Sequence, residues 1–214
     1  MTSNASNPAT GTGQLSAAPL PQTPLNVNCE KKRNDRRPGK AWDDCMVEQL
    51  CAMVKAYNES PHRKRKVSPS PSKTGSKIRG FSREQEQVQN AAYLAYTEGL
   101  NEFSDNFAKL VEAKGKDHPD VVSQFHSECQ HGKWVAEGGP IPVPRSKKTG
   151  SKSPMSPDHM HPAGLGGPYT GQAGLDNLKW ADSMVNSTVG RAMSPHDPEV
   201  HPGGIKAHPS CNCS

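Results

Sequence analysis

The sequence is poor in aromatic residues and in apolar residues generally. Aromatics make up 5% of the 214 residues and apolar residues 32%, whereas there are 19 glycines and 20 prolines. Such a composition cannot pack the whole chain into one core, so we expect long segments without a regular fold. No apolar run approaches the ~20 residues that a membrane-spanning helix needs, so no membrane partner is expected.

Lysine and arginine are absent from residues 1–25, which are rich in Ser, Thr, Asn, Ala and Pro. A secretory signal peptide needs a positively charged segment followed by an apolar one, and this stretch has neither. We therefore expect the protein to be made in the cytoplasm. If it is secreted and acts in the cytoplasm of a target cell, a route independent of a signal peptide must carry it.

No two of the six cysteines form a Cys-x-x-Cys pair. The pair that is nearest in sequence, Cys211 and Cys213, is spaced too closely for a zinc knuckle; with His208 it offers at most an incidental metal site. In a chain without a signal peptide, thiols are expected to stay reduced, so the sequence favours free, partly buried cysteines. The others are Cys29, Cys45, Cys51 and Cys129.

The net charge of +5 is modest, but the basic residues are clustered. Residues 60–81 contain no acidic residue, and a second basic segment at 145–152 includes Lys147 and Lys148. The first segment could be a solvated linker, a nuclear-type localisation signal or a strap that contacts phosphates, and the sequence favours a linker and a strap about equally. The second segment could contact phosphates in a similar way.

Apolar spacing of three and four residues predicts helices over about 41–57, 82–114 and 119–130. Ser82 and Gln85 form a capping-box pattern at the start of the second helix, and Gly115 is a stop signal at its end. These helices most simply pack together as a scaffold. A further helix is expected over about 178–193, where Asn177 would be its first residue.

The segment after residue 154 holds an ordered set of polar residues. On an extended strand, Asp158 and His159 would point to opposite sides, so a turn made by the nearby prolines and glycines is needed to bring both to one site. Asn177 and Asn186 lie nine residues apart. On one helix that separation would place them on roughly opposite faces, so we expect one to face the loop and the other to fasten the other side of the motif.

These residue types suit phosphodiester hydrolysis. Asp and Asn oxygens make a water-rich site for Mg²⁺, and a histidine can take a proton from an attacking water. Four short motifs carry the pattern: Asp158-His159-x-x-Pro162, Gly166-Gly167, Asp176-Asn177-Leu178 and Val185-Asn186-x-x-Val189-Gly190. Together they resemble the motif of the HNH, or ββα-metal, nucleases over about 35 residues.

The resemblance implies a β-hairpin with a metal site against one helix, and it implies a role for each residue. His159 would be the catalytic general base, Asp158 and Asn186 the ligands of Mg²⁺ or Mn²⁺, and Asn177 the middle Asn that ties the loop between the strands. His161 would be either a neighbour of the site or a replacement ligand.

The sequence departs from the family pattern in two ways. Residues 140–193 contain no cysteine, so no structural zinc is expected in this module. Val189 occupies the usual lysine position, which leaves the phosphate to basic residues elsewhere. The candidates are Arg191, Lys179, Lys147 and Lys148.

We therefore expect an α+β protein with a disordered leader (1–37), a mostly helical scaffold (38–133), an HNH module (134–195) and an irregular tail (196–214). The expected function is metal-dependent cleavage of double-stranded DNA, with RNA left open. The context resembles toxin domains of bacterial type VI secretion effectors, which implies an immunity protein and a secretion-system carrier as partners. The alternatives are a phage or mobile-element nuclease, and a non-catalytic nucleic-acid-binding or adaptor protein.

Overall fold

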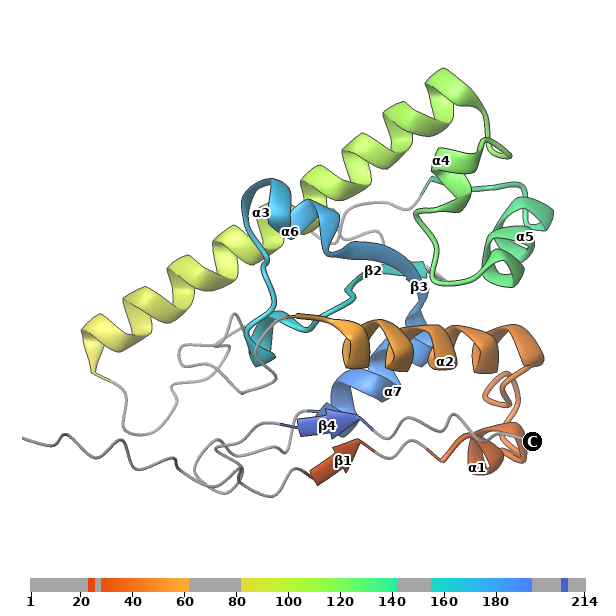
Figure 1. Ribbon diagram of the computed structural model, residues 1–214, viewed down its shortest axis with the longest axis horizontal. Coiled ribbons are helices and arrows are strands. Elements are labelled where there is room, and N and C mark those ends of the chain that lie inside the picture. Colours follow the sequence, from red (N-terminus) through yellow and green to blue (C-terminus); the bar gives the residue numbers. More distant parts are fainter. Residues whose placement is uncertain (1–22, 26–27, 62–81, 142–154, 194–204, 208–214) are drawn as a thin grey trace, which may run out of the picture.

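The structure is a computed structural model, and it describes residues 23–25, 28–61, 82–141, 155–193 and 205–207. At its centre lies an antiparallel hairpin of β2 (Met155–His159) and β3 (Leu178–Asp182). Helices surround this hairpin, as Figure 1 shows. The expected α+β class, mostly helical with a small sheet, is confirmed at this level.

Helix α2 (Asp44–Glu59) begins where the side chain of Asp43 accepts a hydrogen bond from the backbone N–H of Met46. Its bounds differ by two or three residues from the expected helix. Its apolar side packs against α7 (Ser183–Met193), which follows β3 directly. The buried residues of this first core include Trp42, Leu50, Tyr57, Leu165, Val185 and Val189.

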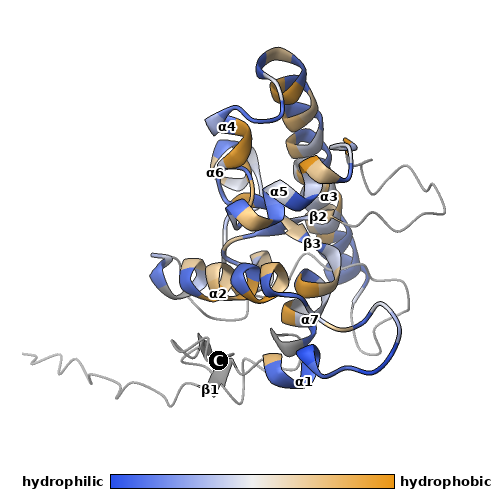
Figure 2. Ribbon diagram, turned by 90° about the vertical axis from the view of Figure 1, so that its right-hand side faces the viewer, coloured by the Kyte–Doolittle hydropathy of each residue, from blue (hydrophilic) through white to orange (hydrophobic). Residues whose placement is uncertain are grey.

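Helix α3 (Arg83–Lys114) confirms the expected long helix. Both hydrogen bonds of the capping box between Ser82 and Gln85 are present, and Gly115, with a φ of 83°, ends the helix. Apolar and hydrophilic residues alternate along it in Figure 2. Its C-terminal half contributes to a second core, which also contains strand residues. That core includes Leu100, Phe103, Phe107, Phe125, Trp134, Leu178 and Trp180.

The single helix expected over 119–130 is wrong. The chain forms α4 (Pro119–Val122) and α5 (Glu128–Ala136) instead. Between them, backbone groups bond to β3: the N–H of Trp180 donates to the carbonyl of Gln124 at 2.7 Å, and the N–H of His126 donates to the carbonyl of Trp180 at 3.3 Å. Because these backbone groups bond to β3, the segment between α4 and α5 is not helical and instead lies alongside β3.

The helix expected to begin near Leu178 is wrong in its first part. Residues 178–182 form β3, and Asn177 follows the short helix α6 (Gly171–Asp176) instead of starting a helix. The reason is tertiary, because β3 pairs along its full length with β2. Helix α7 begins only after Asp182, whose Oδ1 accepts the N–H groups of Met184 and Val185.

Short elements also occur where a disordered leader and an irregular tail were expected. Strand β1 (Thr23–Leu25) pairs in parallel with β4 (Ile205–Ala207), and α1 (Cys29–Arg33) follows β1. The expectation is wrong for these residues. The rest of both ranges, and the basic residues 62–81 and 145–152, lie outside the part of the chain that the structure describes.

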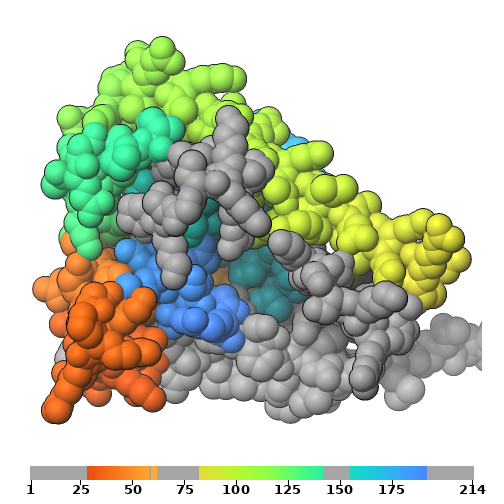
Figure 3. All heavy atoms as spheres, turned by 180° about the vertical axis from the view of Figure 1, so that it is seen from behind, coloured from red at the N-terminus to blue at the C-terminus, as the bar shows by residue number. Residues whose placement is uncertain are grey.

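The expectation of free cysteines is also wrong for the described residues. Cys45 of α2 and Cys129 of α5 form a disulfide with a Cα–Cα distance of 5.4 Å, and Cys29 and Cys51 are disulfide-bonded as well. Figure 3 shows α5 directly above the start of α2 on the rear surface. The fold thus brings together residues 84 positions apart. None of the described helices is long and apolar enough to cross a membrane.

Candidate functional site

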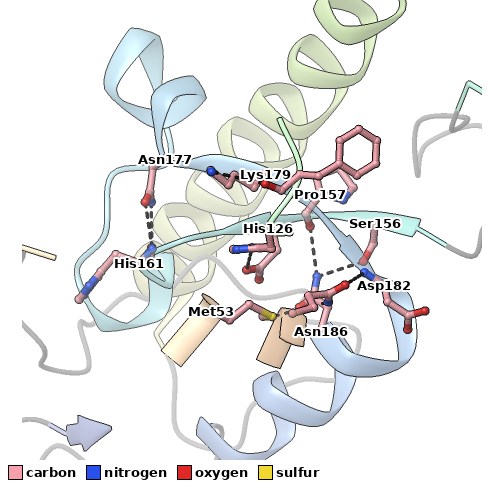
Figure 4. A network of polar contacts seen from close by, with 12 residues as sticks. Met53, His126, Ser156, Pro157, His161, Asn177, Lys179, Asp182 and Asn186 are labelled. Atoms are coloured by element: carbon pink, nitrogen blue, oxygen red, sulfur yellow. Dashed lines mark hydrogen bonds and ion pairs between the residues drawn. The ribbon is translucent and has the colours of Figure 1, made fainter. Parts of the chain in front are cut away.

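Asn177 ties together the loop that joins β2 to β3. Its Oδ1 accepts the N–H of His161 at 2.9 Å, and its Nδ2 donates to the carbonyls of His161 at 2.8 Å and Pro168 at 2.9 Å (Figure 4). The side chain is buried, so these bonds are shielded from water. The geometry gives Asn177 a positioning role, the loop role that the family resemblance implies for it.

His161 lies inside this loop. Its ring is fully buried and stacks on Tyr57 of α2, with ring centroids 5.2 Å apart, and its Nε2 lies 3.3 Å from the carbonyl of Leu165 in the short 3-10 helix η1 (Ala163–Leu165). In Figure 4 the ring points away from Asn186. Gly167 packs so closely that a Cβ there would lie 2.0 Å from the carbonyl oxygen of His161. His161 therefore belongs to the loop's packing.

Asp158 and His159 both lie within β2, and the expected turn between their side chains is absent from the strand. Asp158 pairs with Lys179 and His159 with Leu178 across the hairpin. Neighbouring residues on a strand point to opposite faces. The hairpin therefore separates the two side chains: His159 shares a face with Leu178 of the second core, and Asp158 points to the other face.

His159 is covered by α3. Its exposed fraction is 5%, and its ring stacks on Tyr96 with centroids 5.0 Å apart. Burial lowers the pKa of His159 to about 4, an effect that the negative charge of Asp158 partly opposes. The imidazole is therefore neutral near pH 7 and carries a lone pair that can accept a proton, but the Tyr96 ring largely shields it from solvent.

Asp158 bonds to a residue that sequence reasoning missed. The Nε2 of His126 lies 3.1 Å from Oδ2 of Asp158 (Figure 4), and the two side chains are 2% and 15% exposed. His126 comes from the segment that pairs with the edge of β3. It stands 32 residues before Asp158 in a stretch without a motif, so no sequence signal could have identified it.

Asn186 of α7 reaches the same face of the hairpin as Asp158. Its Nδ2 donates to Oγ of Ser156 at 3.0 Å and to the carbonyl of Pro157 at 3.3 Å. Ser156 and Asp158 are two residues apart on β2 and so share a face. Neither bond uses the Oδ1 of Asn186, the atom that would bind a cation.

The basic residues expected to bind phosphate differ in their surroundings. Lys179 is half-buried, which lowers its pKa, and its Nζ donates to the carbonyl of Phe125 at 3.4 Å. Arg191 is exposed on α7, with its Nη2 3.5 Å from Oγ1 of Thr188. Lys147 and Lys148 lie outside the described residues. Of the described candidates, Arg191 is the one placed to meet a ligand from solvent.

The site therefore has two sides. Asp158 and His126 pair on one face of the hairpin, Asn186 bonds to Ser156 on that face, and His159 lies on the other face beneath Tyr96. Among the described residues, no three His, Cys, Asp or Glu side chains gather in one place. Comparisons of the chain with protein-family models, with curated proteins and with solved structures found no match.

Proposed function

We propose that this protein is a metal-dependent endonuclease of the ββα, or HNH, type that hydrolyses phosphodiester bonds in double-stranded DNA. One observation supports this most strongly: β2 and β3, joined by a loop that contains η1 and α6, form an antiparallel hairpin, and α7 starts directly after β3. Within that unit, Asn177 ties the loop while Asp158 and Asn186 approach one face. The resemblance in sequence implies this order of elements and residues.

The donor set fits a divalent cation such as Mg²⁺ or Mn²⁺. The carboxylate of Asp158 and the amide oxygen of Asn186 are hard ligands of the kind these ions prefer, and water would complete the coordination. A bound cation would stabilise the charge that develops on the phosphoryl group and the leaving oxygen. His159 would take the proton of the attacking water, a role that suits its neutral state near pH 7.

Catalysis by His159 requires Tyr96 to move. Of the residues that α3 contributes before Leu100, only Gln89 is buried, so this half of the helix is the less anchored one. Tyr96 also lies near Tyr169 of the loop, with ring centroids 6.4 Å apart. We propose that DNA bound against the hairpin displaces the Tyr96 ring and exposes His159 to water.

A secreted antibacterial toxin is the biological context we propose. Disulfides such as Cys45–Cys129 form in oxidising compartments and are rare in the reducing cytoplasm, which favours a protein that leaves the cell. An immunity protein in the producing cell and a secretion-system carrier are the partners that such a toxin would need. The context comes by analogy with other toxins and does not affect the proposed chemistry.

The burial of His159 favours a second candidate, a nucleic-acid-binding or adaptor protein in which the hairpin has no catalytic role. A histidine that is 5% exposed and packed on a tyrosine is what a purely structural residue would show. This candidate would bind DNA in a salt-dependent way through basic residues. It would not cleave DNA at any metal concentration.

The two candidates separate in a plasmid assay with purified full-length protein. The nuclease should nick supercoiled DNA with Mg²⁺ or Mn²⁺ and stop when EDTA is added. His159→Ala should lose cleavage by about 100-fold or more, as expected when a general base is removed, while circular dichroism shows an unchanged fold. His118→Ala is the matched control, because His118 caps α4 away from the hairpin and is 37% exposed. Full activity in a folded His159→Ala protein would rule out His159 as the base, and salt-sensitive binding without cleavage would favour the adaptor.

A further inference from the structure

We infer that His126 is a direct ligand of the cation held by Asp158, so that the site has mixed nitrogen and oxygen donors. This inference rests on the proposed metal site but adds a residue from outside the ββα unit. It also predicts which divalent cation the site prefers. A site with an imidazole ligand would favour Mn²⁺ and the later transition-metal ions over Mg²⁺.

The distance between His126 and Asp158 fits two ligands of one ion. Nitrogen and carboxylate oxygen ligands lie about 2.1 Å from small divalent cations, so neighbouring ligands of an octahedral ion are about 3.0 Å apart. The Nε2 of His126 and the Oδ2 of Asp158 are 3.1 Å apart. A cation could therefore replace the shared proton with little movement of either side chain, provided that the ring carries its proton on Nδ1.

The backbone around His126 holds the ring in this position. The N–H of His126 donates to the carbonyl of Trp180, and the N–H of Trp180 donates to the carbonyl of Gln124. Trp180 is fully buried in the second core, so it is a fixed anchor for this segment. The ring of His126 is thus preorganised over the Asp158 face, as a metal ligand must be.

The charges around Asp158 leave it available to a cation. Lys179 pairs with Asp158 across the hairpin, yet its Nζ donates to the carbonyl of Phe125 instead of forming an ion pair with the carboxylate. The side chain of Asp158 remains 15% exposed, which gives an ion a way in from solvent. Asn186 lies on the same face, where its Nδ2 donates to Oγ of Ser156 at 3.0 Å.

Pulsed electron paramagnetic resonance of Mn²⁺ bound to the full-length protein tests this directly, because a coordinated imidazole gives a ¹⁴N coupling. We expect the coupling in the wild type and in His159→Gln and His118→Gln, and its loss in His126→Gln. Gln can keep a hydrogen bond to Asp158 but offers no imidazole nitrogen. Titration should show Mn²⁺ affinity falling by about tenfold or more in His126→Gln, since losing even a residue that supports a metal ligand costs about 10–100-fold. Mg²⁺ affinity should fall by less, because Mg²⁺ readily takes a water in place of the imidazole.

Several results would overturn the inference: no Mn²⁺ bound to the wild type, bound Mn²⁺ without ¹⁴N coupling, or a coupling that persists in His126→Gln. If His126→Gln does not fold, His126→Asn provides the same comparison, and the wild-type spectrum alone can still refute the idea. Plasmid cleavage keeps the two proposals apart. If the protein cleaves the plasmid but shows no ¹⁴N coupling, His126 is not a ligand and the proposed nuclease function stands. If the coupling is present but there is no cleavage, the metal site stands and the nuclease function is refuted.

Discussion

The disulfide between Cys45 and Cys129 should contribute a large part of the protein's stability. It joins residues 84 positions apart and so closes a long loop that contains all of α3. In the chain-entropy description, closing a loop of that length lowers the entropy of the unfolded chain by an amount worth about 4.5 kcal/mol at 25 °C. Domains are typically stable by only about 5–15 kcal/mol, so a loss of that size is severe.

The perturbation is the double substitution Cys45→Ala/Cys129→Ala, followed by unfolding in guanidinium chloride. A reductant is unsuitable because Cys29 and Cys51 are also disulfide-bonded. With an m-value of about 3 kcal/mol/M, the loss should lower the unfolding midpoint by about 1.5 M. Far-UV circular dichroism and tryptophan fluorescence should report the same transition if unfolding is two-state.

Lys133→Ala is the matched control, since it removes a different link between the same parts of the chain. The Nζ of Lys133 forms an ion pair with Oδ2 of Asp43 at 2.6 Å, and the two side chains are 40% and 52% exposed. Exposed pairs contribute about 0–1 kcal/mol, so the control should shift the midpoint little. If the double cysteine variant loses no more stability than Lys133→Ala, loop closure is not what the disulfide contributes, and the reasoning fails.

Three further predictions concern the loop and the histidine beside it. Gly167→Ala should destabilise the protein by about 1–3 kcal/mol in thermal melts, because the new Cβ would collide with the His161 carbonyl. The control is Gly190→Ala, at an exposed helical position with open space, which should be neutral or stabilising. Equal effects of the two substitutions would refute the steric argument. Asn177→Ala should cost about 2–4 kcal/mol in denaturant melts because it leaves buried backbone groups of the loop unpaired, and a loss below about 1 kcal/mol would contradict that role. Since the pKa of His159 falls from 6.5 to about 4 on folding, its contribution is complete above pH 6.5 and is lost toward pH 4, by about 2 kcal/mol at pH 5; melts in EDTA should show this loss in the wild type and not in His159→Gln.

Local signals in the sequence predicted α3 well, and they failed where tertiary pairing decides the structure. The capping box at Ser82 and the stop at Gly115 act within a few residues of the helix ends, so they can be recognised without knowing the fold. The segment from Leu178 is different. Its few apolar residues are compatible with either a helix or a strand, and only pairing with β2 selects the strand.

The candidate site likewise could not be predicted where contacts between distant segments position its residues. The division of roles between Asn177 and Asn186 was expected because of a helical spacing that does not exist, since a strand separates them. Their different contacts arise instead because Asn177 precedes β3 and Asn186 lies on the helix after it. His126 could not be predicted at all, because the backbone pairing with Trp180 brings it to Asp158. The Cys45–Cys129 disulfide likewise depends on how α2 and α5 pack.

The hairpin also explains how the cation side and the base side of the proposed nuclease can be separate yet adjacent. Consecutive residues of β2 point to opposite faces, and β2 ends at His159, where the loop to β3 begins. The loop bonds of Asn177 fix that end. Helix α3 approaches the loop closely at Gly99, where a Cβ would lie 2.9 Å from the carbonyl oxygen of Tyr169. About one turn earlier, Tyr96 of the same helix stacks on His159. In the proposed nuclease, access to His159 would therefore depend on α3, which lies outside the segment that resembles the nuclease motif.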